Sequence, residues 1–266
     1  MNQTFSFRRF GLLFRLYLSE HLRTYLMGLG VLTGVWLFML SQMLNLERFY
    51  PSIYAGHTQS LILVFSAAST WYTSELFKVV QNPVRGIPYL ALPASMFEKY
   101  LVPLTMMFLF IPVFLADFYL IEGFYVSIVN GKLPAGSQKY TVLDFNHPEV
   151  RWFHIPMFIA LLAQSFFFVG SIYFPKVPFV KTGIAALLLF LVGYYFNRAL
   201  LSWQLPSTAV MRNPFPFLGF SFQTPDEKGY YLELTDTGKE AVRIFWYLMF
   251  PALWFITYVR FREKQI

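Results

Sequence analysis

The sequence predicts an all-α polytopic membrane protein. Six transmembrane helices are expected, with an amphipathic interfacial helix at the N-terminus, both termini cytoplasmic, and a small extracytoplasmic β-hairpin before the last helix. Three observations carry this prediction. Hydrophobic residues make up 56% of the 266 residues and charged residues only 13%, whereas soluble proteins have about 25% charged residues. Six apolar runs reach the roughly 20 residues that a membrane crossing needs. Basic residues gather in the segments on one side of these runs.

The N-terminal segment 5–23 has the pattern of an amphipathic helix. At 100° per residue its charged side chains fall on one arc and its aromatic and leucine side chains on the opposite arc. The first set is Arg8, Arg9, Arg15, Ser19, Glu20 and Arg23, and the second is Phe7, Phe10, Leu13, Phe14, Tyr17 and Leu18. Such a helix suits the headgroup plane of a bilayer. The alternative is a plain cytoplasmic extension of the first span.

The six predicted spans belong to a single transmembrane domain covering residues 1–266. They are residues 25–44, 58–80, 101–121, 153–174, 182–201 and 242–259. The second span is the least apolar, with hydroxylated side chains at Ser66, Ser69, Thr70, Thr73 and Ser74. Small and hydroxylated residues let helices approach closely. We therefore expect this span to lie inside the bundle.

The distribution of charge predicts the orientation. With the N-terminus inside, the cytoplasmic segments hold twelve basic and four acidic residues, and the outer segments hold nine basic and ten acidic residues. Cytoplasmic segments are the ones enriched in lysine and arginine. The net charge of +7 is therefore interpreted as a topology signal of a cytoplasmic (inner) membrane protein, with the bilayer as partner and no nucleic acid.

The three outer connections differ in length and in turn signals. Residues 45–57 form a short connection, and residues 122–152 contain turn signals at Asn130-Gly131 and at residues 134–136. The outer insertion, 202–241, alternates apolar and polar residues on both sides of residues 225–229, which predicts the β-hairpin. Thr237 and Glu240 have the spacing of a capping box that opens the last span.

Motifs for catalysis, nucleotide binding and metal binding are absent from the sequence. It has no G-x-x-x-x-G-K-[ST], no H-E-x-x-H and no G-x-S-x-G. It has no cysteine, and its four histidines are spread along the chain. We therefore expect no catalytic residue, no metal site and no cofactor in this chain, so that any ATP hydrolysis takes place in a partner.

Three ionisable residues lie close to the expected outer boundary of the membrane: Asp117, Glu122 and Arg198. Ionisable side chains at membrane depth mark functional sites by default. Asp117 paired with Arg198 would neutralise two costly charges. The alternative is that each side chain reaches the interface separately.

The cytoplasmic segment 81–100, between the second and third spans, is the most ordered polar break in the chain. Ser95 and Glu98 form an S-x-x-E capping box preceded by Pro93, so a helix that leads into the third span begins there. Upstream, Pro83 and the run Gly86-Ile-Pro88 predict a break in the helix. A short element held between two spans suits the docking of a cytoplasmic partner; the alternative is an ordinary cytoplasmic turn.

This segment resembles the cytoplasmic signature of type-2 ABC transporter permeases, an exporter-class family. The resemblance is carried by an acidic residue after the second span, an R-x-G-like turn, a Leu-Pro-x-Ser run and a Glu-Lys pair. The residues are Glu75, Arg85, Gly86, Leu92, Pro93, Ser95, Glu98 and Lys99. Residues 86–89 replace the Gly-Thr-Leu-Glu-Leu core of the family, which places the chain in a divergent branch.

The resemblance implies that the loop is a coupling helix that docks on a separate ATPase subunit. It assigns ATPase coupling to Glu75, Asn82, Arg85, Gly86, Tyr89, Pro93, Ser95, Glu98 and Lys99. It also implies a dimer with a second permease copy or a homologue, and a substrate path between the two.

Two other functions remain open from the sequence. The chain is alternatively a non-transport anchor subunit of an envelope, secretion or motility assembly, or a membrane-embedded lipid-modifying enzyme. The enzyme would need convergent polar residues at one membrane depth, and only Asp117, Glu122, Arg198 and His154 are candidates.

Overall fold

A computed structural model of the chain describes residues 5–45, 48–81, 83–145, 148–204, 210–212, 220–223, 229–232 and 234–264. It is mostly helical. The long helices are α1 (Phe7–Leu40), α2 (Ser52–Glu75), α5 (Met96–Lys132), α6 (His154–Tyr173), α7 (Pro178–Gln204) and α8 (Asp236–Glu263). The short elements are η1 (Ser41–Asn45), α3 (Lys78–Gln81), α4 (Pro83–Ala91), η2 (Pro148–Phe153), β1 (Val210–Arg212), β2 (Phe220–Gln223) and β3 (Gly229–Leu232).

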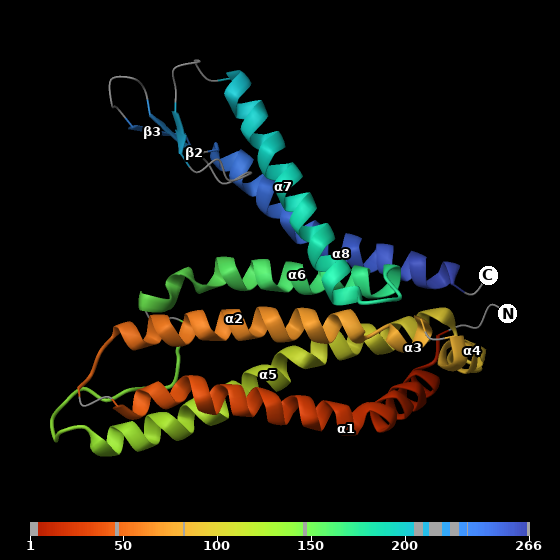
Figure 1. Cartoon of the computed structure of the whole chain (residues 1–266), viewed down its shortest axis with the longest axis horizontal. Coiled ribbons are helices and arrows are strands. Elements are labelled where there is room, and N and C mark those ends of the chain that lie inside the picture. Colours follow the sequence, from red (N-terminus) through yellow and green to blue (C-terminus); the bar gives the residue numbers. More distant parts are fainter. Residues whose placement is uncertain are drawn as a thin grey trace.

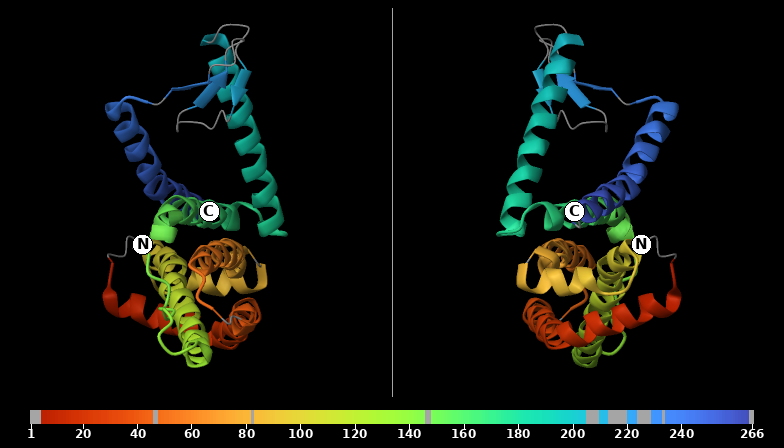
Figure 2. Two further views of the ribbon diagram at one scale, coloured as in Figure 1. Left: turned by 90° about the vertical axis from the view of Figure 1, so that its left-hand side faces the viewer. Right: turned by 90° about the vertical axis from the view of Figure 1, so that its right-hand side faces the viewer.

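Within the described residues, five helices are long and apolar enough to cross a membrane: α1, α5, α6, α7 and α8. Each of them overlaps one of the predicted spans, and α6 has nearly the predicted bounds. The helices α1, α2, α5 and α6 run side by side, and α7 and α8 leave this bundle at an angle (Figures 1 and 2). Both chain ends lie at the same end of the bundle as α3 and α4 (Figure 1).

The helix α2 is the sixth long helix and lies in the interior, as the sequence predicts. Its hydroxyl-bearing face is buried, including Ser69, Thr70, Thr73 and Ser74. These hydroxyls bond carbonyls of their own helix: Thr73 Oγ1 donates to Ser69 O at 2.5 Å and Thr70 Oγ1 to Ser66 O at 2.5 Å. The small side chains therefore let α5, α6 and α7 pack closely on α2 without leaving polar atoms unpaired.

The helix predicted over 5–23 does not end before the first span, so the alternative prediction, an extension of that span, is the one that matches the structure. One continuous helix, α1, runs from Phe7 to Leu40 and bends towards α4 in its first part (Figure 1). No glycine or proline stands between Arg23 and Tyr25, so nothing in the sequence stops the helix there.

The aromatic face of the N-terminal half of α1 packs on protein, except for Phe7, which is 82% exposed. Leu13 and Tyr17 are buried in a hydrophobic cluster with Phe77, Tyr100 and Phe261, which come from three other segments. A second cluster near the other end of the bundle is built around Trp36, Phe65, Phe114 and Phe118. These two clusters form the core that holds α1, α2, α5, α6 and α8 together.

One predicted turn and one predicted cap differ from the structure. Asn130-Gly131 lies inside α5, because the Asn130 side chain bonds the backbone of Tyr140 and not its own turn. The helix α8 is capped by Thr235, whose hydroxyl accepts from Gly238 N at 3.2 Å, while Glu240 pairs with Arg243. The Thr237–Glu240 capping box is therefore wrong.

Two other local predictions are confirmed. Residues 134–137 form a turn in which Ser137 N donates to Pro134 O at 3.2 Å, and Gly136 has the positive φ of 88° that favours glycine. The Ser95–Glu98 capping box opens α5 as predicted.

In the segment before α8, the three strands form an antiparallel sheet in the order β1-β2-β3, with Phe222 opposite Tyr230. The residues that connect these strands lie outside the described part of the chain.

The crossing of α6 and α7 depends on Gly170. A Cβ atom at this position would lie 1.8 Å from Thr182 Oγ1, and Thr182 is buried. We expect Gly170→Ala to lower the free energy of unfolding by about 1–3 kcal/mol, since overpacking a close contact forces the helices apart. Thermal unfolding of the purified protein in detergent measures this.

Gly34→Ala is the matched control, because a Cβ there meets no atom within 4 Å. This variant should be neutral or slightly stabilising, since alanine favours the helix. Equal melting temperatures for the two variants would contradict the close α6–α7 crossing.

Candidate functional site

The candidate site is the junction where the starts of α1 and α5 meet α3 and α4. Its centre is Glu98, whose side chain is fully buried. Glu98 lies in the first turn of α5, where Ser95 Oγ accepts from Glu98 N at 3.2 Å and Ser95 N donates to Glu98 Oε2 at 2.8 Å. This reciprocal pair fixes both the start of α5 and the direction of the Glu98 carboxylate.

The same carboxylate also holds the start of α1. Ser6 N, at the N-cap of α1, donates to Glu98 Oε1 at 2.6 Å. Arg9 adds a charge-assisted contact, with Nη2 at 3.0 Å from Oε1 and Nε at 3.2 Å from Oε2. A buried carboxylate is stable only when it is paired and hydrogen-bonded, and Glu98 meets both conditions. Residues 92 positions apart are thereby joined through one side chain.

Lys99 joins α5 to α4. Only 2% of Lys99 is exposed, and its Nζ donates to Leu90 O at 2.6 Å, at the carboxyl end of α4. A cation at this position also opposes the negative end of the helix dipole. In the reverse direction the Tyr89 hydroxyl donates to Lys99 O at 3.0 Å. Burial raises the pKa of the Tyr89 phenol, so the phenol keeps its proton and remains a donor.

Gly86 lies inside α4, so the predicted break at Gly86-Ile-Pro88 is wrong. Pro88 is also within the helix, where it removes one backbone hydrogen bond of α4. The role of Gly86 is close approach: a Cβ there would lie 2.8 Å from Val80 O. This glycine lets α4 fold back onto α3. Gln81 of α3 in turn donates from Nε2 to Ser171 O of α6.

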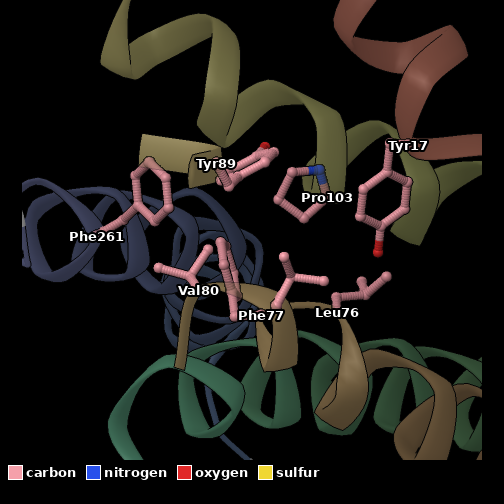
Figure 3. Close-up of a pocket in the computed structure, with 8 residues that line it drawn as sticks. Tyr17, Leu76, Phe77, Val80, Tyr89, Pro103 and Phe261 are labelled. Carbon is pink, nitrogen blue, oxygen red and sulfur yellow. The ribbon is translucent and has the colours of Figure 1, made fainter. Parts of the chain in front are cut away.

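The interior of the junction is apolar. Figure 3 shows Tyr17 of α1, Tyr89 of α4, Pro103 of α5 and Phe261 of α8 around the joint between α2 and α3. Leu76 and Phe77, which form that joint, are nearly or fully buried. The junction therefore couples six helices by packing: α1, α2, α3, α4, α5 and α8.

The surface of the junction that faces away from the helix bundle carries exposed apolar side chains. Ile87 of α4 is 72% exposed and Phe97 of α5 is 45% exposed. Pro88, Ala91 and Pro93 are exposed between them. The junction thus presents apolar side chains on a short, firmly held helix and on the first turn of α5.

The other residues predicted for ATPase coupling contribute less to the contacts of the junction. Glu75 forms an exposed pair with Lys78 at 2.5 Å on the last turn of α2. Asn82 lies outside the described residues, as does the side chain of Arg85. The junction thus brings together Gly86, Tyr89, Pro93, Ser95, Glu98 and Lys99. Ser6 and Arg9 belong to it as well, and the sequence analysis missed their part because it assigned Arg9 only to a basic helix face.

Asp117 and Arg198 do not form the pair considered from the sequence. Asp117 is 8% exposed and accepts from Thr33 Oγ1 of α1 at 2.7 Å, while Asp117 Oδ2 has no hydrogen bond within the described residues. Arg198 is exposed on α7, which packs on α6 and α2. Asp117 therefore contributes to the α1–α5 contact, and the pairing with Arg198 is not found.

Glu122 is fully buried near the opposite end of the bundle from the junction. Its Oε1 lies 2.9 Å from His57 Nδ1 of α2, and its Oε2 accepts from Leu143 N at 3.0 Å. The contact ties the segment after α5 to α2. The sequence analysis missed His57 because it placed this residue in the connection 45–57, whereas α2 already begins at Ser52.

No group of three metal-binding side chains occurs among the described residues.

The chain matches no known family, no curated protein and no solved structure.

The variant Glu122→Ala tests the contact with His57. It leaves the imidazole and Leu143 N–H buried without an acceptor, so we expect the free energy of unfolding to fall by about 3 kcal/mol. Thermal or denaturant unfolding in detergent measures the loss.

Glu75→Ala is the control, since it breaks an exposed pair with Lys78 and should change stability by less than about 0.5 kcal/mol. If the two variants unfolded at the same midpoint, Glu122 would not be the buried anchor described above.

Proposed function

We propose that the chain is the membrane-spanning permease subunit of an ATP-binding-cassette transporter, coupled to a separate ATPase subunit through α4. In this proposal α1, α2, α5, α6, α7 and α8 are the six spans, and the inner membrane carries the chain with both termini in the cytoplasm. The position of both ends beside α3 and α4 supports this topology (Figure 1). So does the excess of basic residues in the same segments.

The observation that carries the proposal is the attachment of α4. Ile87 points outward from a nine-residue helix whose end is bonded to Lys99 and whose neighbour Glu98 is bonded to Ser6 and Arg9. A push on α4 therefore reaches α5 through Lys99 and α1 through Glu98. This is the property that a coupling element needs, because rigid elements carry a shift from one site to another.

The resemblance of residues 85–99 to type-2 ABC permeases points to the same element. In the proposed cycle, ATP-driven closure of the partner moves α4, and α1 and α5 carry the motion to the outer side. The chain itself supplies no nucleotide site, in keeping with the absence of a P-loop motif in its sequence.

The helices α7 and α8 support the proposal of a second permease, a copy or a homologue. Their ribbons spread apart (Figure 2), and most of their apolar side chains are exposed. Large examples are Phe196, Trp203, Phe245 and Phe255. A partner permease and the lipid bilayer share this surface in the proposed assembly, since both are apolar surroundings.

The variant Ile87→Glu tests the proposal. The chain is co-expressed with a candidate P-loop ATPase, and the complex is purified and its ATP hydrolysis measured. A charge at position 87 should lower the amount of ATPase subunit that co-purifies with the chain by about tenfold or more, while membrane insertion stays unchanged. The reason is that burying an unpaired carboxylate in an interface is costly.

Val142→Glu is the matched control, with a 40% exposed valine at the other end of the bundle. Undiminished ATPase recovery with Ile87→Glu would overturn the assignment of α4. A stable partner that lacks a P-loop would instead favour the anchor-subunit function.

A further inference from the structure

The exposed side of the N-terminal half of α1 combines arginines with leucines. Within about 100° of arc it presents Arg8, Leu12, Arg15, Leu22, Arg23 and Leu26, all exposed; we call this the arginine–leucine face. Leu12 is 62% and Leu26 59% exposed. The opposite side of the helix, with Leu13 and Tyr17, is buried in the protein core.

The arginines of this face have no ion pair within the described residues, whereas Arg9, one position along, is bonded to Glu98. The protein therefore uses one arginine of this helix to fasten it and leaves three facing outward. The burial of the aromatic side reverses the expected arrangement, in which that side would enter the bilayer. The arginine–leucine face is the side of the helix left to meet the membrane.

The composition of this face fits the boundary between headgroups and acyl chains. A face in bulk water gains nothing from three exposed leucines, and a face among acyl chains does not tolerate three arginines. Arginine side chains rest their apolar stems on hydrocarbon and extend the guanidinium to the polar layer. Leucines alternating with arginines therefore place each guanidinium at phosphate depth.

The spread of the arginines along the helix matches a tilted segment. At about 1.5 Å per residue, Arg8 and Arg23 lie about 22 Å apart along the axis. The headgroup layer on each side of a bilayer is only about 5–8 Å thick, so an upright helix cannot hold both arginines in it. The bend in the first part of α1 inclines this segment relative to the rest of the helix (Figure 1).

We propose that the arginine–leucine face of α1 binds the headgroups of anionic phospholipids. Each guanidinium donates paired hydrogen bonds to phosphate oxygens, and the leucines contact the upper acyl chains. The binding is additional to the proposed transport function and does not depend on it.

The test is lipid retention by the full-length chain. The protein is reconstituted in vesicles of phosphatidylcholine with a minor fraction of phosphatidylglycerol, extracted gently, and its bound lipids are counted by native mass spectrometry. The wild type should be enriched in phosphatidylglycerol, and the triple variant Arg8→Gln, Arg15→Gln, Arg23→Gln should reduce this enrichment by about tenfold or more.

The control variant removes three basic residues elsewhere: Lys139→Gln, Arg198→Gln, Arg243→Gln. It changes the net charge equally and should keep the enrichment. Equal loss in both variants, or no loss in either, would overturn the proposal.

A second measurement uses the wild type, so it does not depend on the variants folding. Phosphatidylglycerol with a photoreactive headgroup should cross-link to residues 8–26, and raised salt should reduce the labelling, because salt screens headgroup contacts. Labelling confined to other segments, or labelling of 8–26 that salt leaves unchanged, would contradict the assignment.

Discussion

The buried carboxylate of Glu98 is the constraint on which the junction depends. It accepts from the backbone of Ser6 and Ser95 and from the guanidinium of Arg9, so the starts of α1 and α5 share one acceptor. The next residue, Lys99, bonds the end of α4. Glu98 and Lys99 thus organise three helices, and the Glu98 carboxylate is both paired and hydrogen-bonded, as a buried charge requires. The arrangement makes α4 a projection of the transmembrane bundle and not a loose loop.

Polar contacts at the other end of the bundle also join segments that are far apart in the sequence. Glu122 joins α5 to His57 of α2, and the Tyr140 hydroxyl accepts from Tyr50 N at 2.8 Å and donates to Arg48 O at 3.1 Å. These bonds close the segment after α5 over the ends of α2 and η1. Between the two polar ends the helices meet through aromatic packing, such as Trp36 against Phe114 and Phe118. The helices are therefore held by hydrogen bonds near both ends and by aromatic packing between them.

The sequence predicted the helical class and the approximate positions of the long helices, because length and apolar composition determine a membrane crossing. It also predicted the start of α5, because the Ser95–Glu98 box is a local contact between residues three positions apart. Helix ends elsewhere were less predictable. Asn130-Gly131 reads as a turn, yet the turn does not form, because Asn130 bonds Tyr140 ten residues later. Gly86 reads as a break, but it serves the packing of α4 on Val80. The partners Ser6 of Glu98 and His57 of Glu122 lie 92 and 65 positions away, and no local pattern reveals them.

Hydrogen–deuterium exchange on Glu98→Ala tests most directly whether one carboxylate fastens both helix starts. Amide protection is compared with the wild type over residues 6–13 of α1 and 95–99 of α5, and Glu263→Ala, which breaks an exposed pair with Arg260, is the control. The shared-acceptor arrangement predicts that both segments lose protection together, because local opening follows the loss of the bonds that hold a segment. Loss confined to residues 95–99, with residues 6–13 as protected as in the wild type, would contradict it.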